Sequence, residues 1–242
     1  MSVVVREPCL MPDFAPWDSM LKRYVNDGGQ VDYAAWQSES CQELNSWLES
    51  LQSNNFSQLG REEAIALLIN LYNALTIRQV LQTYPIASIR PTFLGLPNWW
   101  AFLRFFNHPV YQLEGKSLSL NGIEHGLLRE QFSEPRLHFA LVCASVGCPL
   151  LRAEAYEPAR LDEQLTADAR RFIRNDDKVR YDATQRILYC SKIFQWYKTD
   201  LLTVADSIPA YISQHRPELD LPDRVTVNFL PYSWALNQRT SS

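Results

Sequence analysis

Hydrophobic residues recur at helical spacing through much of the first half of the chain. Apolar side chains three or four positions apart predict helices over residues 14–26 and around residues 44–51. Another helix is expected to start at Pro158, because proline suits a first turn and apolar spacing resumes after it. Residues 61–84 differ, since they are apolar on nearly every face. A helix of that kind is buried in the middle of a fold.

Shorter apolar runs in the second half of the chain predict strands. Residues 109–120 have the pattern of a hairpin, and residues 136–143 (RLHFALVC) are predicted to form a buried strand. Further strands are expected within residues 179–190 and 225–230. Because helices come early and strands late, we predict an α+β fold in which a helical layer surrounds a small, mostly antiparallel sheet.

The composition predicts one domain over residues 1–242, with flexible ends at 1–12 and 238–242. Of the 242 residues, 46% are hydrophobic and 21% are charged, and no repeat or linker-like segment is present. The net charge of −4 comes without a long run of either sign, so we expect neither nucleic acid nor a membrane as a partner. Because we find no apolar run of spanning length and no secretory signal, we expect a cytoplasmic protein.

Motifs that hold phosphates or metals are missing from the sequence. The eight glycines form neither GxGxxG nor GxxxxGK[ST]. There is no GxSxG serine elbow, no HExxH and no pair of CxxC knuckles. We therefore expect no cofactor and no metal, and we expect a small molecule or a peptide as the substrate. The residues leave the oligomeric state open.

A cysteine and two histidines form the main chemical candidate. A cysteine nucleophile needs a nearby base, and Cys143 stands at the end of the predicted strand, where a side chain can project into a cleft. In a strand, His138 and Cys143 point to opposite faces. His125, on the preceding helix, is therefore the better candidate for the base.

Two further groups near this pair are candidates. Glu124 is a candidate catalytic carboxylate, although together with Asn121 it also matches a capping box that opens a helix. The loop after the cysteine supplies backbone N–H groups near Ser145 and Gly147 that could hold an oxyanion. Ser145 is accordingly a candidate substrate-binding residue.

Each of these candidates also has a structural interpretation. Free cysteines usually pack as small hydrophobic groups, and His125 could be a histidine satisfied within the fold. A metal site built from His125, Cys143 and Cys148 would have looser spacing than usual zinc sites. A disulfide between Cys143 and Cys148 could act as a redox pair, although it lacks the CxxC spacing. Inert thiols are expected at Cys9, Cys41 and Cys190.

Two asparagines interrupt the apolar stretch 61–84. Asn70 and Asn73 lie on one side of the predicted helix, where unpaired amides would cost about 1 to 3 kcal/mol each. They must therefore have partners, which are either loops that they tie to the core or a substrate. Trp99 and Trp100 begin a dense aromatic stretch that is expected to pack in the core or to form the wall of a substrate pocket.

Several blocks of the sequence together resemble one family. The blocks are LINLYNALT (68–76), IEHGLLR (123–129), PRLHFALVC (135–143) with Cys148-Pro149, SKIFQWY (191–197) and YSWALN (232–237). In this order, and from about residue 17 to residue 237, they are similar to the family catalogued as domain of unknown function 547. The family name implies no activity, but similar plant sequences carry serine at the position of Cys148 and keep the cysteine at Cys143. The resemblance thus disfavours the disulfide and the metal site and favours Cys143 with His125.

These residues suggest two functions. The first is a cysteine hydrolase or acyltransferase acting on an amide, peptide or thioester, with Cys143 as nucleophile and His125 as base. An analogy with papain-like and transglutaminase-like enzymes would require rearranged connectivity, since here the histidine precedes the cysteine. The alternative is a non-catalytic binding or scaffold module with an aromatic-lined cleft. The third, orienting residue of a triad stays open among Glu124, Asn70, Asn73 and Asn237.

Overall fold

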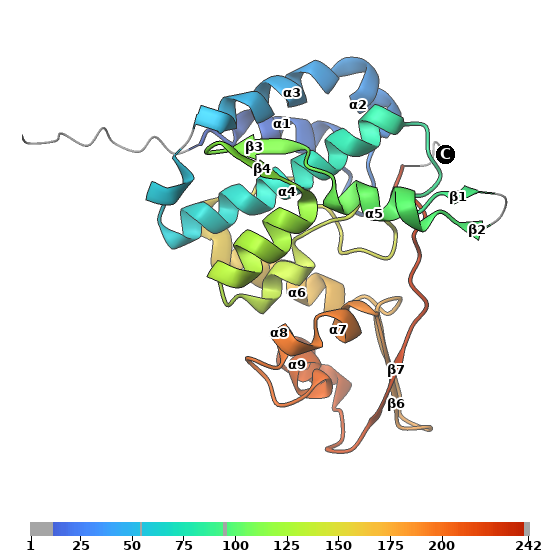
Figure 1. The fold of residues 1–242 in the computed structure, drawn as a ribbon. Helices are drawn as coiled ribbons and strands as arrows, with labels where there is room; N and C mark the ends of the chain where they lie inside the picture. Colours follow the sequence, from blue (N-terminus) through green and yellow to red (C-terminus); the bar gives the residue numbers. More distant parts are fainter. Residues whose placement is uncertain (1–11, 54, 94–95, 240–242) are drawn as a thin grey trace, which may run out of the picture.

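The apolar stretch in the first half of the chain forms the central helix, α4 (Arg61–Thr83), as predicted (Figure 1). Its middle turns are buried on every side, against α2 (Tyr33–Glu39), α3 (Cys41–Ser50) and the π-helical segment η3 (Gly122–Arg129). By length and composition α4 could cross a membrane, but 94% of its apolar 18-residue stretch is buried inside the protein. Its hydrophobic surface therefore forms core.

The computed structural model describes residues 12–53, 55–93 and 96–239. The helices predicted at residues 14–26, at 44–51 and after Pro158 are confirmed, whereas α2, α5 and the helices after residue 192 were not predicted. The remaining α-helices are α1 (Ala15–Tyr24), α5 (Trp99–Asn107), α6 (Leu161–Ile173), α7 (Ile193–Trp196), α8 (Lys198–Leu201) and α9 (Ile208–His215). Short 3-10 segments are η1 (Leu51–Ser53), η2 (Phe56–Gln58), η4 (Pro135–Phe139), η5 (Pro158–Arg160) and η6 (Pro217–Leu219).

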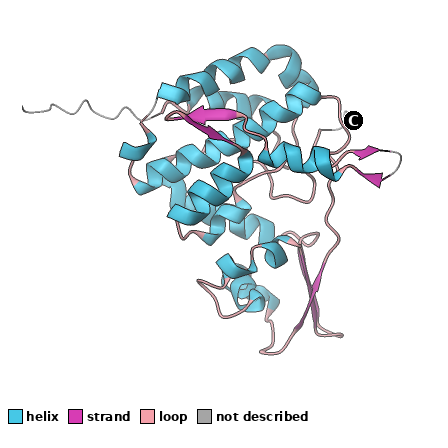
Figure 2. Cartoon of the chain, viewed as in Figure 1, coloured by secondary structure: helices cyan, strands magenta, loops and turns pink. Residues whose placement is uncertain are grey.

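Two short hairpins lie near the helical layer (Figure 2). The predicted one consists of β3 (Tyr111–Leu113) and β4 (Lys116–Leu118), in antiparallel register. Its two-residue turn has positive φ at both positions, as a type I′ turn requires. The other hairpin pairs β1 (Thr92–Phe93) with β2 (Leu96–Pro97).

The third sheet has the order β5-β6-β7, and β6 and β7 lie at the lower right of the molecule in Figure 1. β5 (Val179–Asp182) pairs antiparallel with β6 (Ile187–Cys190), and β6 pairs parallel with β7 (Thr226–Phe229). All three strands were predicted. The fold is α+β, with a helical layer and small, mostly antiparallel sheets.

Two hydrophobic clusters fill the described part of the molecule. The larger surrounds α4 and includes Trp17 and Trp36, whose rings are 5.7 Å apart. The smaller lies among α6, α9 and the third sheet, with Phe172 near its centre. Tyr232 packs against both clusters, as does the segment 137–143, which passes from one to the other. Cys143 therefore lies where the two clusters meet.

The segment 136–143 is not the buried strand that its apolar run predicted. Residues 135–139 form the 3-10 segment η4, and the following residues are irregular. The amide of Asn73 supplies the hydrogen bonds that a neighbouring strand would give, since it donates to Ala140 O at 3.0 Å and accepts from Val142 N at 2.9 Å. A short apolar run indicates burial without deciding the backbone, so the strand prediction was wrong.

The predicted capping box is also absent. Asn121 has helical backbone angles and makes no side-chain cap, because the helix already begins one residue before it. Its amide donates instead to Asn107 Oδ1 at 2.8 Å. Most of the ends predicted to be flexible, residues 1–11 and 240–242, lies outside the described residues.

Candidate functional site

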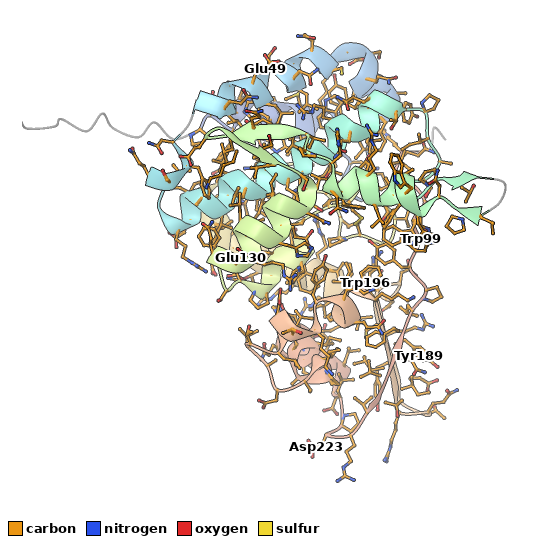
Figure 3. The ribbon with its side chains drawn as sticks, viewed as in Figure 1. Glu49, Trp99, Glu130, Tyr189, Trp196 and Asp223 are labelled. Carbon is orange, nitrogen blue, oxygen red and sulfur yellow. A yellow bond between two sulfur atoms is a disulfide. The ribbon has the colours of Figure 1, made fainter. Side chains whose placement is uncertain are left out.

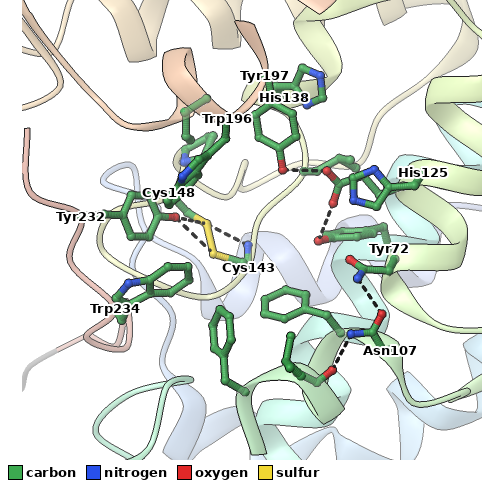
Figure 4. A pocket seen from close by; sticks show the side chains of 18 of the residues that line it. Tyr72, Asn107, His125, His138, Cys143, Cys148, Trp196, Tyr197, Tyr232 and Trp234 are labelled. Carbon is green, nitrogen blue, oxygen red and sulfur yellow. Dashed lines mark hydrogen bonds between the residues drawn. A yellow bond between two sulfur atoms is a disulfide. The ribbon is translucent and has the colours of Figure 1, made fainter. Parts of the chain in front are cut away.

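A cavity of about 440 Å³ opens where the two hydrophobic clusters meet (Figure 4). Its walls come from segments far apart in the sequence, namely α4, α5, η3, the irregular segment after η4, α7 and the segment after β7. Figure 3 shows Trp99 on α5 and Trp196 on α7. Much of the wall is aromatic and includes Trp99, Phe102, Trp196, Tyr197, Tyr232 and Trp234.

Two sulfur atoms lie together in this wall. Cys143 and Cys148 form a disulfide, with Cα atoms 6.2 Å apart, which is within the usual range for such bonds. The expectation of a free Cys143 thiol, and the argument against a disulfide, are therefore wrong for this structure. The reason lies in the backbone, because Ala144 has a left-handed conformation (φ 61°) that turns the chain between the two cysteines. Cys143 is half-buried, whereas Cys148 is only 4% exposed.

The C-terminal segment holds the loop between the cysteines. The N–H group of Gly147 donates to Ser233 O at 2.8 Å. A Cβ atom at Gly147 would come within 2.7 Å of that oxygen and of the Tyr232 ring, so only glycine fits this approach. The Gly147 N–H group that was expected to hold an oxyanion is thus already used. Ser145 is buried and does not line the cavity.

Tyr232 places its phenol directly against the disulfide. The hydroxyl donates to Cys148 Sγ at 3.1 Å and lies 3.4 Å from Cys143 Sγ. It accepts a hydrogen bond from Ser145 Oγ at 3.2 Å. Burial raises the pKa of Tyr232, so the phenol stays protonated and can donate to sulfur at neutral pH.

Glu124 supplies a carboxylate to the opposite side of the cavity. It comes from the π-helical segment η3, a rare helix type that is frequent at functional sites. The side chain is buried, and it accepts hydrogen bonds from Tyr197 at 2.7 Å and from Tyr72 at 3.3 Å (Figure 4). Burial, followed by the charge of Glu124, holds the pKa of both tyrosines well above the usual range. Both phenols are therefore donors.

His125 also lines the cavity, but its ring is not free to act as a base. Nδ1 lies 2.7 Å from Nη1 of Arg129. A guanidinium only donates, so Nδ1 must accept and the proton of the neutral ring must reside on Nε2. His125 in this arrangement is a hydrogen-bond donor through Nε2. The structure contains no hydrogen bond between His125 and Cys143 within the described residues.

His138 lines the cavity and has a carboxylate partner, as a catalytic histidine base usually does. Its ring stacks on Tyr197 at 3.6 Å, and Nε2 lies 2.7 Å from Asp200. Nδ1 is buried and has no partner among the described residues. Burial lowers the pKa of His138, and the hydrogen bonds from Arg129 lead in lowering that of Asp200 to about 2. A neutral histidine therefore donates through Nε2 to an ionised carboxylate.

Sequence reasoning missed His138 with Asp200. The argument against His138 used the alternating faces of a strand, and no strand is present. One signal was available in the SKIFQWY block, which contains three residues of the cavity wall, Ile193, Trp196 and Tyr197. That block had been used only for the family resemblance.

The remaining predicted binding residues separate into two groups. Trp99 lines the cavity, whereas Trp100 is 72% exposed and lies outside it. Asn70 and Asn73 are buried away from the cavity, and both ends of each amide bond to backbone groups. Asn237 similarly accepts from Tyr33 and donates to Gly29 O. Asn70 and Asn73 thus have the structural partners that were one of their two expected uses, and Asn237, expected only as a candidate orienting residue, does not line the cavity.

Comparisons with known proteins agree with the resemblance seen in the sequence blocks. No curated protein and no solved structure matches the chain. Within the described part of the chain, no group of three or more His, Cys, Asp or Glu side chains could hold a metal ion. The family model described as "Protein of unknown function, DUF547" matches residues 56–173, which include α4, Glu124, His125 and both disulfide cysteines. Over these residues the chain matches the DUF547 family.

Proposed function

We propose that this protein is a thiol–disulfide oxidoreductase whose working pair is Cys143 and Cys148. The observation that carries the proposal is a disulfide in the wall of an aromatic cavity, with one sulfur more accessible than the other. If the chain works in the cytoplasm, as its sequence predicts, a disulfide there is usually transient and catalytic.

The chemistry requires the reduced pair. The Cys143 thiolate attacks one sulfur of a substrate disulfide, forms a mixed disulfide and expels the first substrate thiolate. Cys148 then attacks Cys143 Sγ, forms the internal disulfide and releases the second substrate thiolate. The protons of the two cysteine thiols end on the two released thiols. A small dithiol in solution restores the reduced pair by the same exchange in reverse.

The surroundings of the two sulfurs support this division of roles. Cys143 is half-buried at the cavity wall, which gives it access to a substrate. Cys148 is 4% exposed and receives a hydrogen bond from Tyr232, a contact that would stabilise its thiolate. Access and leaving-group stability both decide which sulfur is attacked. Cys143 is therefore the attacking residue and Cys148 the resolving residue.

Trapping of the mixed disulfide tests the proposal. Reduced Cys148→Ser should form a stable adduct with bis(hydroxyethyl) disulfide, and intact-mass measurement should place it on Cys143. Reduced Cys143→Ser should form its adduct at least about tenfold more slowly, because the buried Cys148 is poorly accessible. Cys41→Ser is the matched control, since this cysteine is outside the pair, and it should turn over like the wild type. Equal adduct rates in the two cysteine variants would contradict the proposal.

A cysteine hydrolase or acyltransferase is the second candidate. It is favoured by the presence of Cys143, Glu124 and His125 in the walls of one cavity. Reduction would free the Cys143 thiol to attack a carbonyl carbon, with His125 or Glu124 moving the proton. Against this candidate, Nδ1 of His125 is occupied by Arg129, and the Gly147 N–H group by Ser233.

The resolving cysteine separates the two candidates. Turnover of a nitrophenyl ester by the reduced protein should survive Cys148→Ser if the protein is a hydrolase, and should fall in Cys143→Ser and His125→Ala. Oxidation of the reduced protein by a disulfide, with no dithiol present, should stop at the mixed disulfide in Cys148→Ser, because within the pair only Cys148 can release it. If the protein turns over neither substrate, the cavity would instead fit the non-catalytic binding module.

A further inference from the structure

The charge of the cavity wall is unbalanced. Glu124 contributes a carboxylate, and no lysine or arginine lines the cavity within the described residues. Its two hydrogen-bond donors, Tyr72 and Tyr197, are neutral phenols. The nearby Arg129 is already engaged, because its guanidinium makes two hydrogen bonds to Asp200, at 2.7 and 2.9 Å. The carboxylate of Glu124 therefore faces the cavity, while the charge of the nearby Arg129 is paired with Asp200 outside the cavity wall.

The aromatic rings add attraction for a positive charge. The faces of Trp, Tyr and Phe rings attract cations, and the attraction grows when water is excluded. Rings of this wall already take part in such contacts from outside the cavity, since the Arg90 guanidinium lies 5.5 Å from the Trp234 ring and 5.7 Å from the Trp99 ring. The wall thus combines one carboxylate, Glu124, with aromatic surface, and these are the features that an organic cation with an apolar body requires.

From this combination we infer that the cavity selects substrates carrying an ammonium group, which binds at Glu124 and the neighbouring rings while the reactive sulfur lies at Cys143. The inference rests on the proposed function, because it names the class of disulfide that the same cavity would accept. An amine-bearing disulfide has both required groups. A carboxylate-bearing disulfide would meet Glu124 as a like charge and should be rejected.

Three small disulfides that differ in charge test the inference. Cystamine carries ammonium groups, bis(hydroxyethyl) disulfide is neutral, and dithiodiglycolate is anionic. Each rate of oxidation of the reduced full-length protein is divided by the rate of the same disulfide with dithiothreitol, which removes intrinsic reactivity. The corrected rate should be about tenfold higher for cystamine than for the neutral compound, and lowest for dithiodiglycolate. Equal corrected rates for the three would overturn the inference while leaving the oxidoreductase proposal intact.

Two glutamine variants assign the selectivity to one carboxylate. Glu124→Gln should reduce the cystamine preference to near the value set by the rings alone. Glu130→Gln makes the same change in net charge on the same stretch of chain, but at an exposed position distant from Trp99 and Trp196 (Figure 3), and should keep the full preference. A loss of preference in both variants would mean that overall charge, and not the cavity, attracts the cation.

A binding measurement without sulfur chemistry separates the two proposals. In Cys143→Ser/Cys148→Ser, benzyltrimethylammonium should quench tryptophan fluorescence at a lower concentration than its uncharged carbon analogue, and Glu124→Gln should reduce the difference to that set by the rings alone. If no disulfide is exchanged but this preference is found, the oxidoreductase proposal fails and the cation site stands. If the two probes bind equally, the cation site fails whatever the sulfurs do.

Discussion

The two asparagines of α4 and His138 in the cavity wall are all buried, yet they differ in how fully their hydrogen bonds are satisfied. Asn70 bonds both the N–H and the C=O of Tyr156, and Asn73 bonds backbone groups on either side of Leu141. In the cavity wall, Nδ1 of His138 has no partner among the described residues.

The difference separates two uses of buried polarity. A side chain whose donors and acceptors are all taken by backbone ties segments together, and it has nothing left for a ligand. Asn73 thereby holds the segment that leads into Cys143, and Asn70 holds the chain at Tyr156. Incompletely satisfied groups in a cavity wall cost stability, and they are the ones that can bind or exchange protons. The same helical core therefore supports two regions, the fully bonded asparagine contacts and the cavity wall, where a polar atom of His138 has no partner among the described residues.

The largest effect on stability is expected from removing an asparagine contact. Asn73→Ala leaves Ala140 C=O and Val142 N–H buried without partners, so the free energy of unfolding should fall by about 3 kcal/mol. Urea denaturation measures the loss. Glu62→Ala, an exposed change on the same helix, should alter stability by less than about 0.5 kcal/mol. A loss in Asn73→Ala no larger than this control would show that the amide does not hold the loop.

A smaller effect is expected from opening the disulfide. The bond closes a loop of only a few residues, and loop entropy for such a length corresponds to about 2 kcal/mol of stability at most. Urea denaturation with and without reductant should show a shift of this size in the wild type. Cys143→Ser should be insensitive to reductant, whereas Cys41→Ser should respond like the wild type. Complete unfolding on reduction would give the bond a mainly structural role.

The smallest effect concerns the unpaired ring nitrogen. Burial lowers the pKa of His138 in the folded protein, so below the unfolded value of about 6.5 the unfolded chain binds a proton that the folded protein does not. Stability from this residue is present above that pH and is lost as pH falls from about 7 to 5. His138→Gln should therefore show a flatter stability curve over this range than the wild type.

A second histidine contributes to this pH effect. The pKa of His215 is also lowered by burial, so the wild-type curve should contain a second contribution of the same sign. An identical slope in the wild type and in His138→Gln would contradict the assigned direction.

Much of the fold could be predicted because its elements are periodic. The helices α1, α3, α4 and α6, the β3–β4 hairpin and the third sheet each have a local pattern of apolar spacing or turn residues. The short helices α7 to α9 have too few turns to show such a period. The segment 136–143 is apolar because two clusters meet there, and its backbone is decided by Asn73 from another part of the chain.

The candidate site could be predicted only in part. Cys143, Glu124 and His125 were selected by residue type, and all three line the cavity. The support of His138 by Asp200 spans 62 positions, and no local pattern indicates it. The disulfide required a left-handed residue at Ala144, which a sequence without glycine at that position did not suggest.

By itself the sequence determined the central helix, the α+β class, the family blocks and the residue types able to do chemistry, because these depend on local spacing and composition. Only the tertiary structure decided which groups meet: it joined Cys143 to Cys148, occupied Nδ1 of His125 with Arg129 and directed His138 toward Asp200. The physical reason is that hydrogen bonds and sulfur contacts act over about 3 Å between segments that packing brings together. Hydrophobic periodicity records which face is buried, but not which polar group lies opposite it.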